Sequence, residues 1–359
     1  MSNHPPRVHP GEIKDLDFDE IIDVRSPSEF IEDHVPGALN LPVLSDSERA
    51  QVGTLYRNAS PFEARRMGAG LVSANIACHL SGDLSDKDRD FRPLVYCWRG
   101  GKRSAAMAIV LSSIGWHPHL LDGGYKAYRS FVRQSLAGLL EQQIPFRVIA
   151  GLTGSGKTLL LQRLEKLGEQ VVDLEAIAAH RGSALGEEPD QRQPGQKRFE
   201  TLLLERLCIL DSKRPVYIES ESSRIGCLQI PDVMWSLMKK APVIEVSVPR
   251  QDRATYLLNA YPHFTDNADL LIEKLEPVRR LQSSAVFAQW EEAISRGEFL
   301  EFVQSILENH YDPAYRRSRE KTYMEACAKL TMKRVSGECL DKVARDIIQL
   351  EGDLASISN

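Results

Sequence analysis

The sequence predicts an α/β protein in which two domains with mainly parallel sheets precede a helical region. Two apolar, strand-like runs at 93–96 and 146–150 each lead directly into a glycine-containing polar loop and then a helix pattern. From residue 266 onward the pattern is helical, with few strand signals. We therefore expect three parts, at residues 1–140, 141–265 and 266–359.

The composition is that of an ordinary globular protein. Of the 359 residues, 42% are hydrophobic and 26% are charged, which is typical of folded soluble domains. No apolar run is long enough to span a bilayer, and the first ten residues lack the apolar stretch of a secretory signal. The six cysteines form no CxxC pair, so we expect neither a disulfide framework nor structural zinc. These features favour a cytoplasmic protein with no membrane partner.

The charge distribution excludes a uniformly basic nucleic-acid binder, because the formal net charge is −5. Residues 314–334 nevertheless hold seven Lys or Arg against two Glu. A solvated helix face is the alternative interpretation of such a run. The basic residues that we expect to bind a polyanionic substrate are Arg316, Arg317, Arg319 and, in an insertion-like segment at 42–92, Arg57, Arg65 and Arg66.

Strands alternate with helices over the first 140 residues, which indicates a parallel sheet. In such sheets ligands lie beyond the carboxyl ends of the strands, and Cys97 stands at such an end. Gly100 and Gly101 allow backbone N–H groups to converge there, and the following helix adds partial positive charge. This arrangement holds an anion and favours the nucleophilic thiolate. The predicted catalytic residues are Cys97, Arg99 and Arg103; a buried structural cysteine is the alternative.

The stretch 151–158 matches the phosphate-binding pattern G-x4-G-K-[ST], with a strand before it and a helix after it. Backbone N–H groups of such a P-loop surround a phosphate, its lysine reaches terminal oxygens, and its last hydroxyl can ligate Mg²⁺. It suits any diphosphate, because the amides bind phosphates whatever is attached to them. The predicted phosphate-binding residues are Gly151, Gly154, Ser155, Gly156, Lys157 and Thr158.

Four acidic residues follow the next two strand-like runs, at Asp173, Glu175, Glu219 and Glu221. Acids in these places hold Mg²⁺, or a water bound to it, in P-loop enzymes. A helix N-cap or a solvated loop is the alternative for each. We expect no tightly bound cofactor, and Mg²⁺ is compatible with these residues.

The strings at 23–25, 34–38 and 121–125, with the Cys97 loop, resemble a rhodanese domain over roughly residues 8–138. The resemblance implies a cysteine that carries sulfur or selenium. The spacing from Cys97 to Arg103 is C-x5-R, one residue longer than the common sulfurtransferase loop. That length resembles the rhodanese-like dual-specificity phosphatases, whose larger loop would hold a tetrahedral phosphate.

Together with these strings, the stretches 151–158, 173–183 and 219–226 resemble the tRNA 2-selenouridine synthase family over nearly the whole chain. The resemblance implies a transferase that converts wobble 2-thiouridine in the tRNA anticodon to 2-selenouridine, with selenophosphate as donor. It also implies S-geranylation from geranyl diphosphate, and a selenophosphate-supplying enzyme as partner. Arg181 and Ser183 would then bind substrate, whereas Ser223 stands where a basic residue is expected.

Two other interpretations remain open from the sequence. A rhodanese-like phosphatase fused to a P-loop kinase would account for the C-x5-R spacing and the P-loop, although the cysteine loop contains no acid to donate a proton. A nucleotide-gated tRNA-binding module with an idle rhodanese fold is the third interpretation. Retention of Cys97 argues against it.

Overall fold

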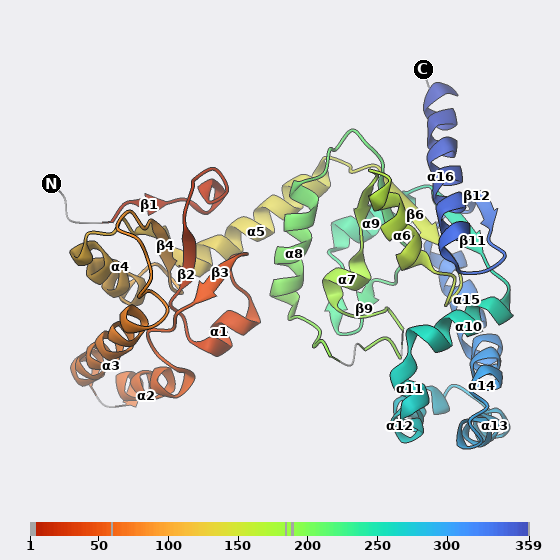
Figure 1. Ribbon diagram of the computed structural model, residues 1–359, viewed down its shortest axis with the longest axis horizontal. Coiled ribbons are helices and arrows are strands. Elements are labelled where there is room, and N and C mark those ends of the chain that lie inside the picture. The colour runs from red at the N-terminus through yellow and green to blue at the C-terminus, as the bar shows by residue number, and fades with distance from the viewer. Residues whose placement is uncertain (1–4, 59, 184, 188–189, 358–359) are drawn as a thin grey trace. The chain divides into compact units, whose positions relative to one another are not determined.

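The computed structural model describes residues 5–58, 60–183, 185–187 and 190–357. The chain forms two compact units, each built on a parallel sheet, which confirms the predicted α/β class (Figure 1). The first unit comprises residues 1–137 and 195–204, and the second comprises 138–194 and 205–359. The division at residues 140 and 265 stays a prediction.

The first unit has a five-stranded sheet in the order β1-β5-β4-β2-β3, with every pair parallel. The strands are β1 (Arg7–Val8), β2 (Glu20–Asp23), β3 (Ala38–Asn40), β4 (Pro93–Tyr96) and β5 (His119–Leu121). Asp23 at the end of β2 pairs in register with Tyr96 at the end of β4. Because both strands end together, the residues that follow β2 lie beside Cys97.

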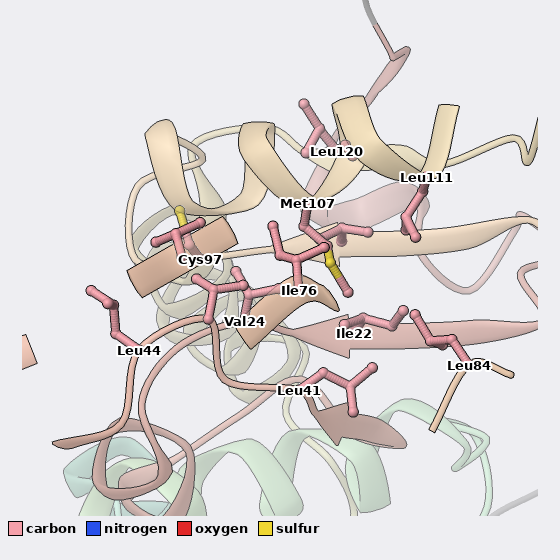
Figure 2. Close-up of a cluster of buried hydrophobic side chains, with 14 of the residues drawn as sticks. Ile22, Val24, Leu41, Leu44, Ile76, Leu84, Cys97, Met107, Leu111 and Leu120 are labelled. Atoms are coloured by element: carbon pink, nitrogen blue, oxygen red, sulfur yellow. The ribbon is translucent and has the colours of Figure 1, made fainter. Parts of the chain in front are cut away.

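Helices cover this sheet and complete its core. They are α1 (Pro27–Glu32), α2 (Asp46–Asn58), α3 (Pro61–Ser81), α4 (Lys102–Ile114) and α5 (Gly124–Glu141), with a short 3-10 helix η1 (Pro10–Glu12). The insertion-like segment therefore forms the packed pair α2 and α3. Cys97 belongs to the same buried cluster as Val24, Ile76 and Met107 (Figure 2).

Part of α8 (Gln196–Cys208) also belongs to the first unit, although it follows the P-loop in the sequence. Phe199 and Leu203 are buried. Thr201 donates a hydrogen bond to Asp33 Oδ2 (3.1 Å), and Arg198 donates one to the carbonyl of His34 (3.1 Å). The order of elements along the chain does not encode which unit a helix joins.

The second unit has a five-stranded parallel sheet in the order β12-β11-β6-β8-β7. The strands are β6 (Phe146–Ala150), β7 (Gln170–Val172), β8 (Val216–Glu219), β11 (Val243–Ser247) and β12 (Ala326–Thr331); β9 (Arg224–Ile225) and β10 (Leu228–Gln229) form a separate small hairpin. β6 lies in the middle and pairs with β8, so that Ile149 is opposite Glu219. The P-loop after β6 therefore lies next to the acids that follow β8.

The helices of the second unit fall into two sets. In the first set, α6 (Lys157–Lys166) follows β6, α7 (Leu174–Ala178) follows β7, α9 (Asp232–Lys240) follows the small hairpin, α10 (Arg250–Ala260) follows β11 and α16 (Gly337–Ile357) follows β12. The second set is a helical region with an apolar cluster of its own. The helical region comprises α11 (Pro262–Asp266), α12 (Ala268–Arg279), α13 (Ser284–Ser295), α14 (Phe299–Ile306), a π-helix η2 (Leu307–Tyr311) and α15 (Asp312–Thr322). Trp290, Phe287 and Phe302 lie in its buried cluster.

The helical pattern predicted from residue 266 onward is wrong at 326–331. α15 ends at Thr322, and Ala326–Thr331 form the edge strand β12 beside β11. This stretch alternates between half-buried and exposed residues. Its alanines, leucine and lysine favour helices locally, but β11 supplies backbone hydrogen-bond partners that only the tertiary fold brings near.

Candidate functional site

The predicted thiol loop connects β4 to α4, as expected. Cys97 is 3% exposed, and the Ser104 hydroxyl donates a hydrogen bond to its Sγ (3.2 Å). The backbone N–H of Tyr125 donates to the Cys97 carbonyl (2.8 Å). A Cβ on Gly124 would lie 2.3 Å from that same carbonyl oxygen, so the position requires glycine. The segment 122–125 thus packs against the backbone of the cysteine loop and fixes its position.

A buried polar network supports this loop. Arg25 forms an ion pair with Asp23 (2.6 Å), and both side chains are fully buried. The Arg25 guanidinium lies 3.9 Å from the centre of the Tyr125 ring. Tyr125 in turn donates a hydrogen bond to Asp33 Oδ2 (2.9 Å). Burial raises the pKa of Asp33, against the opposing effect of its hydrogen bonds from Tyr125 and Thr201.

The two predicted catalytic arginines have different surroundings. Arg103 forms an ion pair with Glu29 (2.8 Å), and Arg49 contacts the same Glu29 oxygen (3.1 Å). Burial would raise the pKa of Glu29, but these two arginines outweigh it and lower that pKa. Arg99 is exposed and lines a shallow cavity with Lys126. Arg103 therefore positions the start of α4, whereas Arg99 is accessible to an anionic ligand.

The P-loop forms between β6 and α6, as predicted. Gly154 and Gly156 have φ angles of +80° and +76°, which side chains rarely adopt. Ser155 Oγ is buried and has no hydrogen-bond partner among the described residues. All the predicted phosphate-binding residues except Gly151 line one cavity. An unsatisfied hydroxyl at a P-loop is the feature expected where phosphate oxygens bind.

Lys157 and Gly151 interact with each other and with α15. Lys157 Nζ donates to the Gly151 carbonyl (3.1 Å) and lies 5.7 Å from the centre of the Tyr315 ring. The Gly151 N–H donates to Tyr315 Oη (2.9 Å). Burial alone would lower the pKa of Lys157, but Tyr315 and Glu175 outweigh it and raise that pKa. The ammonium therefore stays charged at neutral pH.

The four predicted acids divide into different roles. Asp173 caps α7 by accepting the Ala176 N–H (2.8 Å), as the alternative interpretation proposed. Glu175 accepts a hydrogen bond from the Thr158 hydroxyl (2.8 Å), and its backbone N–H donates to Glu219 (2.8 Å). Burial raises the pKa of Glu219 well above its ordinary value.

These oxygens fit a magnesium ion held partly by substrate. Glu219 Oε2 is buried and has no hydrogen-bond partner among the described residues. Among the residues that the structure describes, no group of three or more His, Cys, Asp or Glu side chains is arranged to hold a metal ion by itself. Mg²⁺ is commonly bound through one or two carboxylates together with substrate phosphates. Thr158 and Glu175 therefore suit Mg²⁺ only in the presence of a phosphate ligand.

Glu221, Arg181 and Ser183 line the P-loop cavity. Burial, followed by the charge of Glu175, raises the pKa of Glu221 to about 8. The Arg181 guanidinium lies 4.4 Å from the centre of the Tyr261 ring and donates to the Ala260 carbonyl (2.9 Å). The resemblance-based expectation that Arg181 and Ser183 contact substrate is therefore compatible with their position.

A second, apolar cavity adjoins the phosphate cavity. The two share Thr153, Ser183, Leu257 and Tyr261. Most of the remaining walls of the second cavity come from the helical region, with Leu185 and Leu258 from outside it; the residues from the helical region include Phe264, Leu271, Phe299, Phe302, Val303 and Ile306. A ligand that occupies both cavities needs a phosphate end and a hydrocarbon end.

The predicted polyanion-binding arginines do not form a single group. Arg57, Arg65 and Arg66 are exposed on α2 and α3, where Arg66 pairs with Glu63 (2.6 Å). Arg316 and Arg317 are exposed on α15. Arg319, on the same helix, instead lines the phosphate cavity.

Several cavity residues carry no local sequence signal for phosphate binding. They come from α10, from α15 and from the turn after it: Tyr256, Tyr261, Tyr315, Ser318 and Tyr323. A helical spacing of three, four and seven residues places Tyr315, Ser318, Arg319 and Thr322 on one face of α15. That spacing was visible in the sequence, but the surface that the face covers was not.

Arg253 has a structural role at the P-loop. It forms a buried ion pair with Asp312 (2.8 Å) and donates to the carbonyl of Thr153 (2.9 Å). The P-loop backbone is therefore anchored to α10 and to the start of α15.

The described part of the chain has no helix with the length and apolarity to cross a membrane, and all six cysteines are free.

Comparisons with known proteins agree with this architecture. Residues 144–270 match the family described as tRNA 2-selenouridine synthase AAA domain, and residues 10–131 match the rhodanese-like domain family. A tRNA 2-selenouridine synthase of Bdellovibrio bacteriovorus is 32% identical, over 90% of this chain and 96% of the relative. One of Psychromonas ingrahamii is 30% identical over 84% of this chain and 88% of the relative, and one of Nitrosomonas europaea is 36% identical over 67% and 63%. The thiol loop, the P-loop cavity and this similarity along nearly the whole chain identify it as a member of the tRNA 2-selenouridine synthase family.

Proposed function

We propose that this chain converts wobble 2-thiouridine in tRNA to 2-selenouridine in two steps, with selenophosphate as the selenium donor. In the first step geranyl diphosphate alkylates the sulfur and diphosphate leaves. In the second step the selenium of selenophosphate bonds to C2, the C2–S bond breaks and geranyl thiol leaves, and water hydrolyses the Se–P bond to release phosphate. Family membership carries the overall conversion. The pair of adjoining cavities carries the proposal of a prenyl diphosphate.

The two cavities suit the two ends of such a substrate. The P-loop amides and Lys157 would hold the diphosphate, and the walls around Phe299 and Phe302 would surround the hydrocarbon chain. Burial of each CH₂ group contributes about 0.8 kcal/mol. A nucleotide would instead place its polar base or ribose against these apolar side chains, which costs desolvation free energy.

The alkylation step requires stabilisation of the leaving group. The thiouridine sulfur forms a bond to C1 of the geranyl group, the C1–O bond breaks, and its electron pair passes to the diphosphate. The N3 proton of the thiouridine is released to solvent. Charge therefore grows on the diphosphate oxygens, where the Lys157 ammonium and the start of α6 are already placed. Mg²⁺, when bound through Thr158 and Glu175, would neutralise part of the same charge.

We assign the selenium chemistry to Cys97. Its Sγ accepts a hydrogen bond from the Ser104 hydroxyl. Its loop leads into α4, and the partial positive charge at the start of that helix favours the thiolate. Arg99 is an exposed cation of this loop. The proposal places the protein in the cytoplasm, beside an enzyme that supplies selenophosphate.

The test is nucleoside mass spectrometry of 2-thiouridine-containing tRNA after each partial reaction with the purified protein. Geranyl diphosphate alone should give S-geranyl-2-thiouridine, and subsequent selenophosphate should give 2-selenouridine. Selenation without any geranylated product, or an obligatory requirement for ATP, would contradict the two-step proposal. Neither result would affect the family assignment. Dephosphorylation of small metabolites would instead favour the phosphatase–kinase alternative.

A further inference from the structure

Arg319 differs from the other basic residues of α15. Arg316 and Arg317 are exposed, whereas the Arg319 side chain is only 16% exposed and lines the phosphate cavity. It lies one helical turn after Tyr315, which contacts the first residue of the P-loop. Arg319 therefore lies at the P-loop cavity, whereas Arg316 and Arg317 lie on the exposed face of α15.

The guanidinium of Arg319 has unused hydrogen-bonding capacity. Its Nε and Nη2 are buried and have no hydrogen-bond partner among the residues that the structure describes. Nη2 does lie 3.4 Å from Glu245 Oε2 on β11, and the side chain of Glu245 is 35% exposed. The side chain as a whole lines the cavity, so a ligand that brings acceptors to the guanidinium can form hydrogen bonds that these donors do not make within the protein.

We propose that Arg319 is a further binding residue of the P-loop cavity and contacts the phosphate oxygens of a diphosphate held there. The identity of that diphosphate as a prenyl diphosphate rests on the proposed function, but the contact itself requires only a diphosphate. The planar guanidinium presents several N–H groups in a fixed geometry that matches phosphate oxygens.

The contact adds a second cation to the Lys157 ammonium. When the C1–O bond breaks and the sulfur–C1 bond forms, the electron pair moves to the bridging oxygen and spreads over the diphosphate. Arg319 stabilises this charge from α15, and Lys157 stabilises it from α6. Besides Lys157 and Arg319, the ionisable groups that line the cavity are Glu175, Arg181, Glu221, Tyr256, Tyr261, Tyr315 and Tyr323.

The direct test compares Arg319→Ala with Lys321→Ala, which removes the same charge from an exposed position on the same helix. Inorganic pyrophosphate is the probe, titrated calorimetrically into the full-length protein. We expect Arg319→Ala to lower pyrophosphate affinity roughly 10- to 100-fold and the geranylation rate on the order of 10²-fold. Lys321→Ala should change neither. Arg319→Gln, which keeps polarity and much of the volume, repeats the test if the alanine variant does not fold.

Other outcomes separate this inference from the proposed function. Unchanged pyrophosphate affinity in a folded Arg319 variant would overturn the inference. Unchanged affinity together with a reduced salt dependence of tRNA binding would assign Arg319 to the RNA backbone instead. If the wild type binds pyrophosphate through Arg319 but does not geranylate tRNA, the proposed function fails while the inference stands.

Discussion

The hydroxyl oxygen of Tyr315 accepts a hydrogen bond from the backbone N–H of Gly151, with 2.9 Å between the two atoms. This bond joins α15 to the first residue of the P-loop, 164 residues earlier in the chain. The same oxygen lies 2.8 Å from Ser220 Oγ, just after β8. One phenol thus connects the P-loop, the end of β8 and the helix that carries Arg319. The C-terminal helical region therefore forms part of the wall of the P-loop cavity.

Removal of this hydroxyl should weaken the P-loop. Tyr315→Phe leaves the Gly151 N–H without its acceptor, and an unsatisfied buried donor costs about 1–3 kcal/mol. We expect a lower free energy of unfolding by urea denaturation and weaker pyrophosphate binding. Tyr56→Phe is the control, because Tyr56 is 50% exposed. Equal loss in both variants would show that the Gly151 contact is not responsible.

Lys157 should be needed for only one of the two chemical steps. Lys157→Ala removes a charge from the site of the leaving diphosphate, which typically lowers the rate on the order of 10²-fold or more. Selenation of tRNA that has already been geranylated should proceed, because no diphosphate leaves in that step. Lys166→Ala, at the exposed end of α6, should geranylate normally. Normal geranylation by Lys157→Ala would remove the P-loop from this reaction.

Cys97 should show the reverse separation. Cys97→Ser retains a small polar side chain beside Ser104 but no longer provides a thiolate. We expect it to abolish selenation while leaving geranylation and tRNA binding largely intact, as measured by nucleoside mass spectrometry. Cys78→Ser alters an exposed cysteine on α3 and should behave like the wild type. Wild-type selenation by Cys97→Ser would exclude the thiol as the selenium-handling group.

The exposed arginines of α15 are proposed to contact tRNA phosphates. Reversal of Arg316 and Arg317 to Glu should weaken tRNA binding and reduce its salt dependence by roughly one unit of slope for each lost contact. Arg280→Glu with Arg296→Glu makes the same charge change at other exposed sites. A separate triple reversal tests the cluster on α2 and α3: Arg57, Arg65 and Arg66. An unchanged slope would assign the altered face to solvent.

The buried Asp33 carboxyl should make stability depend on pH. Burial raises its folded-state pKa above the ordinary value of 3.8, so the folded protein holds this proton more tightly than the unfolded chain. The stability from the neutral form is complete below pH 3.8 and is lost as pH rises through the raised pKa.

Asp33→Asn removes that loss. The amide oxygen can still accept from Tyr125 and Thr201, so the variant should gain stability relative to the wild type as pH rises from 4 towards 8. The measurement is the unfolding midpoint at several pH values. Asp15→Asn, at an exposed site, should show no such trend. A pH-independent difference between Asp33→Asn and the wild type would mean that Asp33 does not titrate in this range.

The sequence by itself determined the features that a short stretch of chain encodes. The P-loop could be predicted because strand, glycines, lysine and helix are contiguous at 146–167. The position of Cys97 at a strand end follows from the apolar run before it and the helical period after it. The parallel α/β class follows from the alternation of such elements.

Only the tertiary structure decided which side chains meet at the P-loop cavity. β12 forms at a stretch with local helix preference because β11 supplies its hydrogen-bond partners. Arg319 resembles its neighbours in composition, yet the packing of α15 against the P-loop places it in the cavity. The apolar cavity likewise combines residues from 153 to 311. Local propensities and motifs are short-range, whereas these contacts depend on burial and pairing between segments that lie far apart in the chain, which no window of sequence contains.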